Sequence, residues 1–543
     1  MAGFALNEIG LHRETHFGNR SVLCLTPRPH DMRDIFDTAV RLAPERVAVR
    51  DAQRALTYAA LDAEAMKFAS ALVAAGLCPG DRIALNTGNR IEFVVGLLAA
   101  FKAGFIAMPV GHRHRRAELV GLYRDAGVCA VLCDAETAPE QPDRTEVPSL
   151  RLYIGVATDV VSAGERGTSY AELLGTAPLH PQFEQPKIDE DACAVLMYTS
   201  GTTGRPKGAK ITHFGMVHTV LHYRMVFQLK DGEVSVLAVP CTHVTGLAAQ
   251  ILVMFGCAGT LIMMPHFDTG RFVELAAQHA LTYTIMVPAM YTLLLHRDAL
   301  KNGALPTWRI GAFGGAPMPE AIRLRLAETL PHLSLHNAYG ATETTSPATL
   351  VPLGLSAVTD SVGRVVPCGE LRIVDDAGRD VGEGEGGELL IKGPMVVPGY
   401  WENPEADALS FHDGYWRSGD IATRDAEGNI RIRDRKKDVI NRGGYKIFSA
   451  EIENLLLEYE GVREAALVPY PCSVLGERAH AFVYAGEGMS TVDEAMLRAF
   501  LAARVADYKV PDRFTIRTEP LPRNVNGKLV KTELRQEAAR AGI

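Results

Sequence analysis

The sequence lacks a long uninterrupted apolar run, an excess of basic residues and a leader-like amino terminus. Its most hydrophobic stretch, residues 93–110, contains Lys102, two glycines and a proline, which indicates a buried helix followed by a strand. The 56 Lys and Arg residues are outnumbered by 64 Asp and Glu, so nothing indicates the basic surface of a nucleic-acid-binding protein. The amino terminus lacks the basic-then-apolar pattern of a signal peptide. We expect a cytoplasmic protein without a transmembrane segment or a nucleic-acid partner.

The cysteines lack the spacing of a metal site. There are nine, and the one close pair, Cys129 and Cys133, is not a CxxC motif and has no second pair at zinc-like spacing. Free thiols in a reducing compartment explain them. The composition, 47% hydrophobic and 22% charged over 543 residues, is typical of a globular chain with roughly three or four compact units.

Short β-branched runs alternate with amphipathic stretches through the first three quarters of the chain. We expect strands at 46–50, 82–86, 105–110, 129–133, 234–240, 260–265 and 283–288, and helices at 57–77 and 117–127. This alternation predicts an α/β fold with a large N-terminal domain of layered, largely parallel sheets.

The pattern of apolar and turn-forming residues changes after Ser361. Short strands separated by Gly/Asp turns predict a small β-barrel-like subdomain. A helix at 449–461, with Ser449 as its N-cap, then opens a smaller α+β unit. The charged segment 434–438 suits a linker or hinge. We therefore predict an N-terminal domain of residues 1–434 and a C-terminal domain of residues 435–543.

A loop rich in glycine and hydroxyl residues carries the first chemical signal, YTSGTTGRPKG at 198–208. Glycines let a backbone approach a ligand closely, and N–H groups, hydroxyls and a lysine suit phosphate. The loop is not a Walker A motif, because Lys207 lies between Pro206 and Gly208. A turn-rich surface loop is the alternative that the composition leaves open.

The loop resembles the phosphate-binding signature of the adenylate-forming superfamily, which includes acyl-CoA synthetases, peptide-synthetase adenylation domains and firefly-type luciferases. Four further segments resemble that superfamily's motifs in the same order: NAYGATE at 337–343, YWRSGD at 415–420, DRKKDVINRGGYKI at 434–447 and NVNGK at 524–528. Each segment alone also fits an ordinary turn or a solvated charged face. Five in order make coincidence very improbable.

The resemblance implies a two-step reaction that uses ATP, Mg²⁺ and coenzyme A. A carboxylate attacks the α-phosphate of ATP, pyrophosphate leaves, and a thiol then takes the acyl group and releases AMP. Because charge accumulates on the phosphates in the first step, cations and oriented donors are the main catalytic tools.

The resemblance also implies roles in the N-terminal domain. Glu343 is the expected Mg²⁺ ligand and Thr342 the donor to the α-phosphate, while Tyr339 and Asn337 serve adenine and His243 borders the acyl pocket as a gate. The remaining expected nucleotide contacts are Thr199, Ser200, Gly201, Thr202, Thr203, Gly204, Lys207, Gly315, Ala316, Ala338 and Gly340.

In the C-terminal part, Asp420 is expected to bind the ribose hydroxyls and Arg435 the ribose or phosphate. Lys437 resembles the hinge about which a mobile lid domain rotates. Lys528 is expected to bridge the substrate carboxylate and the α-phosphate, where a cation offsets the repulsion of two anions. The contacts implied for the later segment are Gly443 and Gly444 with the pantetheine arm, and Lys446 with phosphate or substrate.

The sequence indicates the carboxylic acid substrate and the acyl acceptor less clearly than it indicates the nucleotide. The expected pocket walls, 243–246, 287–294, 314–317, Ala338 and 344–348, are mostly apolar or small. No arginine for a second carboxylate and no Asp for an amino group stands among them, which favours a fatty or aromatic monocarboxylic acid. Histidines and arginines at 111–116 have no matching role and are interpreted as a solvated face or a phosphate-attracting patch.

Three functions compete. The first is an acyl-CoA synthetase, an AMP-forming acid–thiol ligase. The second is a stand-alone adenylation enzyme that loads a carrier protein. The third, a nucleotide-binding protein that has lost catalysis, is disfavoured because Glu343 and Lys528 are both present. A homodimer is left open.

Overall fold

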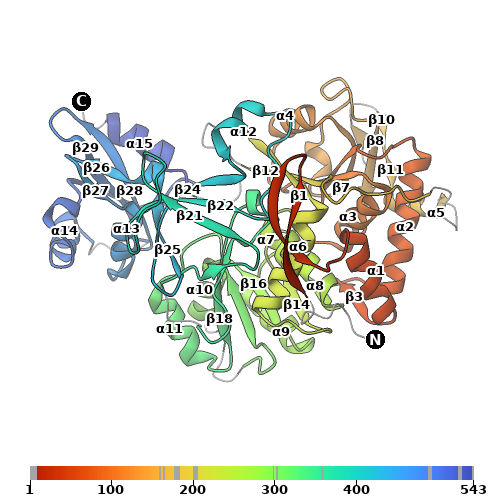
Figure 1. The fold of residues 1–543 in the computed structure, drawn as a ribbon, viewed down its shortest axis with the longest axis horizontal. Coiled ribbons are helices and arrows are strands. Elements are labelled where there is room, and N and C mark those ends of the chain that lie inside the picture. The colour runs from red at the N-terminus through yellow and green to blue at the C-terminus, as the bar shows by residue number, and fades with distance from the viewer. Residues whose placement is uncertain are drawn as a thin grey trace. The chain divides into compact units, whose positions relative to one another are not determined.

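The computed structural model describes residues 9–540, apart from 158–160, 163–164, 177–183, 200–205, 298, 301–303, 356–359, 487–491 and 524–528. The chain divides into two compact units (Figure 1). Unit 1 comprises residues 1–371 and 391–416, and unit 2 comprises residues 372–390 and 417–543. Each is described by itself below.

The first sheet of unit 1 has seven strands in the order β11–β8–β7–β5–β6–β12–β13. Neighbours pair in parallel except β12 and β13, which are antiparallel. The strands are β5 (Arg82–Asn86), β6 (Ile106–Pro109), β7 (Val128–Asp134), β8 (Leu152–Val156), β11 (Thr168–Ser169), β12 (Cys193–Thr199) and β13 (Lys207–Thr212). Parallel strands buried on both faces are the reason for their continuous apolar sequences.

Helix α3 (Ile91–Ala103) is buried at every position and packs against β5, β6 and α2 (Tyr58–Ala74). It ends at Gly104, which adopts the left-handed conformation (φ 71°), and β6 follows directly. The hydrophobic stretch 93–110 is therefore a core helix and a core strand, as predicted. No described helix combines the length and apolarity that a bilayer span requires.

Two further sheets complete the parallel core of unit 1. Their orders are β14–β15–β3–β4 and β16–β17–β18–β19–β20. Their strands are β3 (Val47–Arg50), β4 (Ala55–Thr57), β14 (Val234–Leu237), β15 (Thr260–Met263), β16 (Tyr283–Met286), β17 (Ile310–Phe313), β18 (Ser334–Tyr339), β19 (Thr349–Leu350) and β20 (Arg364–Val365). All seven strands expected from residues 46 to 288 are present, with ends that differ by up to three residues.

Helices pack between and beside these strands. They are α1 (Met32–Leu42), α4 (Arg116–Ala126), α5 (Tyr170–Thr176), α6 (His213–Val226), α7 (Val244–Gly246), α8 (Val253–Gly256), α9 (Thr269–Gln278), α10 (Pro288–His296), α11 (Glu320–Thr329) and α12 (Pro404–Ser410). Residues 247–252 form a π-helical turn between α7 and α8. The predicted strand that ends in VP at 287–288 stops earlier, because Pro288 occupies the first turn of α10.

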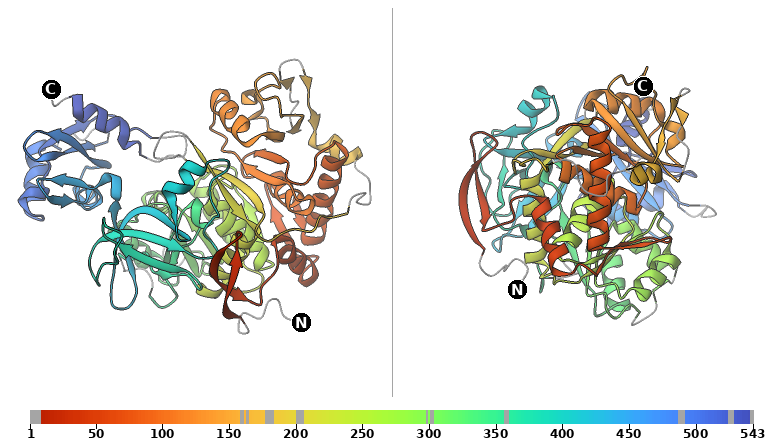
Figure 2. Two further views of the ribbon diagram at one scale, coloured as in Figure 1. Left: turned by 45° about the horizontal axis from the view of Figure 1, so that its top comes forward. Right: turned by 90° about the vertical axis from the view of Figure 1, so that its right-hand side faces the viewer.

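An antiparallel hairpin of β1 (Gly10–His16) and β2 (Arg20–Thr26) precedes the α/β core and had no sequence prediction. It lies along the edge of unit 1 in both views of Figure 2. The His16 ring stacks on Phe214 of α6 with a centroid distance of 3.8 Å, which fastens the hairpin to the core.

Unit 2 contains most of a five-stranded sheet of order β21–β22–β24–β23, in which β25 also pairs with β24. Its strands are β21 (Glu370–Val374), β22 (Gly387–Lys392), β23 (Phe411–His412), β24 (Tyr415–Arg424) and β25 (Ile430–Arg435). These are the short strands with Gly/Asp turns that the sequence predicts after Ser361.

The rest of unit 2 is the predicted α+β unit, a second sheet with helices α13, α14 and α15 around it (Figure 1). Its strands are β26 (Ile440–Arg442), β27 (Tyr445–Ile447), β28 (Glu464–Cys472), β29 (Gly476–Tyr484) and β30 (Arg513–Arg517). The helices are α13 (Ser449–Glu458), α14 (Glu494–Ala502) and α15 (Lys531–Arg540).

The expected N-cap of α13 is wrong. Phe448 occupies the cap position and offers no side-chain acceptor. Instead, the Asp434 carboxylate at the end of β25 accepts hydrogen bonds from the backbone N–H and the hydroxyl of Ser449. A distant carboxylate therefore satisfies the first turn, where negative charge is favourable.

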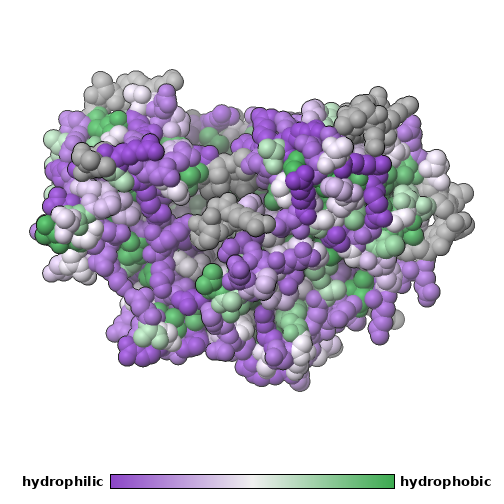
Figure 3. Space-filling view, turned by 90° about the horizontal axis from the view of Figure 1, so that it is seen from above, coloured by the Kyte–Doolittle hydropathy of each residue, from purple (hydrophilic) through white to green (hydrophobic). Residues whose placement is uncertain are grey.

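The surface in Figure 3 is mainly hydrophilic, with hydrophobic residues scattered in small groups. The most exposed large apolar side chains are Val474 at 84% and Leu409 at 74%. Scattered apolar residues of this kind are normal on a globular surface.

Candidate functional site

The carboxyl ends of three parallel strands place two predicted motifs side by side in unit 1. Met286 of β16, Phe313 of β17 and Asn337 of β18 lie opposite one another in register. The loops that follow must therefore meet at one edge of the sheet. They come so close that a Cβ atom on Gly314 would lie 2.4 Å from the carbonyl oxygen of Ala338. Ligands of α/β sheets bind at such strand ends.

This edge holds backbone atoms rather than bulky side chains. Gly315 and Ala316 of the GGAP loop are exposed, and Gly315 has φ +79°, which a glycine adopts without strain. Asn337 and Tyr339 are half-buried on β18. The structure thus brings together the predicted residues Gly315, Ala316, Asn337, Ala338, Tyr339 and Gly340.

A short turn after β18 carries the two residues predicted for the phosphate and the metal. Thr342 and Glu343 begin a single 3₁₀ turn, and each is only 9% exposed. The Tyr400 hydroxyl donates to Glu343 Oε1 at 2.9 Å, and the Val397 N–H donates to the Glu343 carbonyl at 3.0 Å. Burial and the Glu343 charge raise the pKa of Tyr400, so its phenol stays a donor. Glu343 is therefore held at two points: Val397 bonds to its backbone carbonyl, and Tyr400 bonds to one carboxylate oxygen.

The turn is strained and tightly clamped. Ser346 has φ +103° and Thr345 has φ +49°, conformations that side-chain-bearing residues rarely adopt. A Cβ atom on Gly340 would lie 1.5 Å from the Ser346 carbonyl oxygen. From α6, the Thr219 hydroxyl donates to the Thr345 carbonyl at 3.0 Å, and the Tyr223 and Ser346 hydroxyls lie 3.0 Å apart. These contacts stabilise a geometry that local preferences oppose.

The ends of the predicted phosphate loop lie next to each other. Thr199 ends β12 and Lys207 begins β13, and the two residues pair across the antiparallel ladder. The Lys207 ammonium lies 5.0 Å from the centroid of the Tyr400 ring. Ser200, Gly201, Thr202, Thr203 and Gly204 lie outside the described residues. The described part thus places a cation of this loop beside the residue that holds Glu343.

Tyr400 is a site residue that the sequence analysis missed. It is 4% exposed and stands far along the chain from both Glu343 and Lys207. Its only sequence signal is a Gly-Tyr-Trp triplet after the strand GELLIKG, which by itself indicates a turn. Its role depends on contacts that no local pattern contains.

His243 stands between β14 and α7, at the position that precedes the helix. Its N–H donates to the Pro240 carbonyl at 3.1 Å, and the Leu247 N–H donates to the His243 carbonyl at 2.9 Å. A Cβ atom on Gly246 would lie 2.3 Å from the Pro240 carbonyl oxygen. The segment is therefore folded back on itself, and the His243 ring is partly exposed.

The expected walls on α10 divide into two groups. Tyr291 and Leu294 are fully buried in the core of unit 1, where the Tyr291 ring stacks on Trp308 at 6.1 Å. Ala289 is exposed and Met290 half-buried. The exposed side of α10 is therefore the part that remains available to line an acyl pocket.

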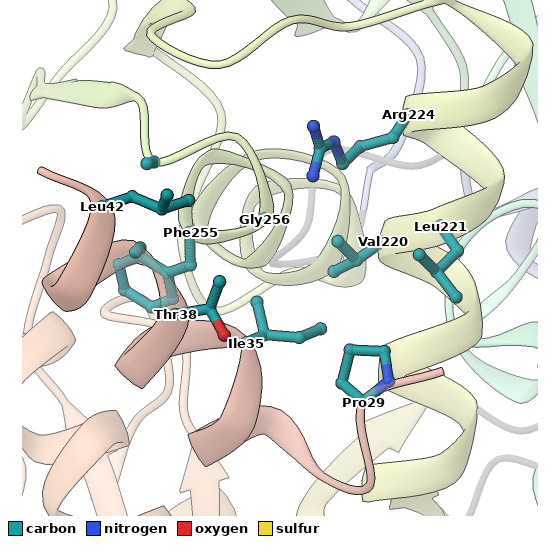
Figure 4. Close-up of a pocket in the computed structure, with 11 residues that line it drawn as sticks. Pro29, Ile35, Thr38, Leu42, Val220, Leu221, Arg224, Phe255 and Gly256 are labelled. Atoms are coloured by element: carbon teal, nitrogen blue, oxygen red, sulfur yellow. The ribbon is translucent and has the colours of Figure 1, made fainter. Parts of the chain in front are cut away.

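A small cavity lies elsewhere in unit 1, between α1, α6 and α8 (Figure 4). Its volume of about 20 Å³ is close to that of one water molecule. Arg224 points toward it with a buried Nε that has no hydrogen-bond partner among the described residues, and its other end pairs with Asp231 at 2.8 Å. A cavity of this size does not hold an acyl chain.

Glu14, His16 and Cys24 bring potential metal ligands within 4.8 Å of one another. However, the Arg28 guanidinium donates to both Glu14 oxygens at 2.8 Å, and His16 Nδ1 lies 2.8 Å from Asp191 Oδ1. The hydrogen bonds from Arg28 are the main reason why the pKa of Glu14 falls to about 2. Arg28 and Asp191 therefore already bind the Glu14 and His16 atoms that could serve as ligands, and these contacts fasten the β1–β2 hairpin.

In unit 2, the structure pairs Asp420, predicted to bind the ribose, with Arg435, predicted to bind the ribose or phosphate. They pair across β24 and β25, and Arg435 Nε lies 2.8 Å from Asp420 Oδ1. Asp420 is buried, whereas more than half of the Arg435 side chain is exposed. The ion pair therefore has one fixed partner and one partner that reaches solvent.

The hinge and the glycine turn follow in the chain. Lys437 lies in a 3₁₀ turn (Lys436–Asp438), and its carbonyl accepts a hydrogen bond from Arg535 at 2.9 Å. Gly443 and Gly444 link β26 to β27 with φ +61° and +95°. Lys446 is exposed on β27. Lys528 lies outside the described residues.

Two family models match the chain. Residues 36–401 match the family described as AMP-binding enzyme, and residues 451–528 match the AMP-binding enzyme C-terminal domain.

Two curated relatives and one solved structure illustrate the similarity. The chain is 34% identical to a feruloyl-CoA synthase of Amycolatopsis over 91% of this chain and 96% of the relative. It is 32% identical to the long-chain-fatty-acid–CoA ligase FadD13 of Mycobacterium tuberculosis over 89% of this chain and 93% of the relative. The o-succinylbenzoate coenzyme A synthetase MenE of Bacillus subtilis, in complex with ATP and a magnesium ion, superposes with a TM-score of 0.80 at 26% identity. That match covers 93% of this chain and 98% of MenE.

Proposed function

Because the chain belongs to the AMP-binding enzyme family, we propose that it activates a hydrophobic carboxylic acid with ATP and transfers the acyl group to coenzyme A. The coarser predictions are confirmed: the fold class is that of adenylate-forming enzymes, and the activity is ATP-dependent acyl-CoA ligation. ATP, Mg²⁺ and coenzyme A are the corresponding cofactors and substrates. The acid class and the roles of individual residues are the proposal.

The observation that carries the proposal is the meeting of Lys207, Tyr400 and Glu343 beside the loops at the ends of β17 and β18. In the first step, a carboxylate oxygen attacks the α-phosphorus, and the bond to the pyrophosphate oxygen breaks. Lys207 would stabilise the departing phosphates, and the Thr342 hydroxyl would donate to the α-phosphate. The small residues of the GGAP loop leave room for the acyl group and the adenine.

Glu343 fits a magnesium ion. It offers a hard carboxylate oxygen: Tyr400 donates to Oε1, and Oε2 accepts no hydrogen bond from the described residues. Mg²⁺ held there would offset the negative charge of the phosphates. The contribution of the described residues is to hold the carboxylate in place through the Tyr400 hydroxyl.

The remaining roles are proposed on the resemblance alone. Asp420 and Arg435 bind the ribose, Lys528 approaches the acid carboxylate and the α-phosphate, and Gly443 with Gly444 serves the pantetheine arm. We propose the domain boundary at 434/435, with Lys437 as the hinge of a mobile C-terminal domain. The Arg535 side chain donates to the Lys437 carbonyl, and this contact supports the proposal that the turn is a structured hinge.

For the acid, we propose a fatty or aromatic monocarboxylate. The expected walls are mostly apolar or small, and the curated relatives are named for feruloyl and long-chain fatty acids. A location in the cytoplasm is supported by nine free cysteines. A homodimer is the proposed assembly, to be measured by light scattering during size-exclusion chromatography.

The test is a panel of carboxylic acids in an assay of AMP release, run with coenzyme A and in parallel with a carrier protein. We expect AMP release with a fatty or aromatic acid that depends on coenzyme A. Release with only dicarboxylic or amino acids would contradict the acid class. Release that needs the carrier protein would favour the alternative, a stand-alone adenylation enzyme.

A further inference from the structure

We propose that Tyr400 is a positioning residue that holds the metal-binding carboxylate and the phosphate-binding lysine apart and in place. The hydroxyl donates to Glu343 Oε1 at 2.9 Å, and the ring faces the Lys207 ammonium at 5.0 Å from its centroid. One side chain thus contacts two residues of opposite charge. The inference rests on the proposed function, which assigns Glu343 to Mg²⁺ and Lys207 to phosphate.

The backbone around Tyr400 is fixed by the strand that begins with Lys207. Tyr400 forms an antiparallel bridge with Ala209 of β13. The Trp401 N–H donates to the Gly208 carbonyl at 2.7 Å, and the Lys210 N–H donates to the Gly399 carbonyl at 3.1 Å. Tyr400 therefore moves with the end of the phosphate loop, although 193 residues separate it from Lys207 in the sequence.

The side chain of Tyr400 is held as well. It is 4% exposed, and its ring packs on Phe411 with a centroid distance of 5.6 Å. The backbone N–H of Tyr400 donates to Asp407 Oδ1 at 2.6 Å. A ring that is fixed on its backbone and on one face holds its hydroxyl at Glu343, and the side chains of Trp416 and Ser410 also approach this hydroxyl.

The arrangement matters because Glu343 and Lys207 would otherwise attract each other. A direct ion pair would occupy the carboxylate that the metal needs and neutralise the ammonium that the phosphate needs. Tyr400 offers each a weaker partner: a neutral donor for one carboxylate oxygen, and a π-face for the ammonium. Neither residue is then drawn into a direct ion pair with the other.

Two variants separate the hydroxyl from the ring. Tyr400→Phe removes the donor and keeps the ring, whereas Tyr400→Leu removes both. The measurements are calorimetric binding of a non-hydrolysable ATP analogue with and without Mg²⁺, and Mn²⁺ binding to the enzyme–analogue complex by electron paramagnetic resonance. Thermal unfolding of each variant monitors folding.

For Tyr400→Phe, we expect metal binding to weaken about tenfold, because a hydrogen bond to a charged group is lost, while metal-free binding of the analogue is unchanged. For Tyr400→Leu, we expect metal-free binding to weaken as well. The matched control is Tyr58→Phe, which removes a buried hydroxyl that donates to the Gly259 carbonyl at 2.8 Å and should leave both affinities unchanged.

Wild-type metal binding in a folded Tyr400→Phe protein would overturn the role of the hydroxyl. Wild-type metal-free binding in Tyr400→Leu would overturn the role of the ring. Glu343→Gln distinguishes the premise from the inference. If that variant binds Mn²⁺ like the wild type, the assignment of Glu343 to the metal is wrong and the inference falls with it, whereas the acid panel remains an independent test of the ligase activity.

Discussion

Arg435 and Asp420 are each other's partners across two antiparallel strands, with Arg435 Nε 2.8 Å from Asp420 Oδ1. Both residues are predicted to contact the nucleotide. The guanidinium fixes one oxygen of the buried carboxylate, which orients the whole group for a ligand. We therefore predict that the pair acts as one preformed acceptor for the nucleotide rather than as two separate contacts.

This pairing predicts how Asp420→Asn changes nucleotide affinity. We expect ATP binding to weaken about tenfold, because a charged acceptor for the ribose hydroxyls is lost. The same substitution should cost less with 2′-deoxy-ATP, which lacks one of those hydroxyls. The measurement is the dissociation constants of ATP and 2′-deoxy-ATP for the wild type and for Asp420→Asn. Equal losses for the two nucleotides would mean that Asp420 acts only through Arg435.

Lys528→Ala should separate the two half-reactions. We expect ATP–pyrophosphate exchange to fall about a hundredfold or more, because a cation beside the attacking carboxylate and the α-phosphate is lost. Thioester formation from supplied acyl-AMP should be largely spared. Lys187→Ala, at an exposed lysine of unit 1, is the control for the loss of one positive charge. Surviving exchange in Lys528→Ala would show that another group has this role.

Gly340→Ala should disrupt the turn that carries Thr342 and Glu343. The added methyl group would lie 1.5 Å from the Ser346 carbonyl oxygen, so the backbone must move. We expect the free energy of unfolding to fall by about 2 kcal/mol and ATP binding to be lost. Urea unfolding and calorimetry measure the two effects.

Gly121→Ala is the matched control for that substitution. It lies within α4, and a Cβ atom there would meet nothing within 4 Å. The change should stabilise the protein by up to about 1 kcal/mol, because alanine favours a helix. Normal ATP binding by Gly340→Ala would mean that the turn tolerates a backbone shift.

Three buried histidines on α6 should make the protein sensitive to acid. Burial lowers the pKa of His213 to about 4 and of His222 to about 3, and lowers that of His218 well below its usual value. Below pH 6.5 these histidines bind protons in the unfolded chain but stay neutral in the folded protein. The free energy of unfolding therefore falls as the pH falls. Each histidine contributes up to about 1.4 kcal/mol per pH unit between pH 6.5 and its folded pKa.

The measurement is urea unfolding between pH 7.5 and 5. His222→Gln should show a shallower loss of stability than the wild type, since one titrating group is removed. His12→Gln, at an exposed position, should keep the wild-type slope. An identical slope in His222→Gln and wild type would show that this histidine does not govern the acid response.

Local patterns predicted much of this structure because they report local physics. The run 93–110 is a buried helix and strand. Its apolar residues do not alternate with polar ones, which indicates an element that is covered on all sides. Glu343, Lys207 and Asp420 are predicted site residues because each belongs to a contiguous motif that resembles a motif of the adenylate-forming superfamily. The predicted roles of Ser200, Gly201, Thr202, Thr203, Gly204 and Lys528 stay predictions, since these residues lie outside the described ones.

By itself, then, the sequence determined the strand–helix alternation of the α/β core and the chemical identity of the candidate residues. The tertiary structure alone decided which of them meet. Ser449 was expected to cap its own helix, and Asp434 does so from β25. Tyr400 showed no chemical signal, yet it contacts both Glu343 and Lys207. The reason is physical: hydrogen bonds and ion pairs between distant segments depend on strand register and packing, which are set only when the whole core is assembled.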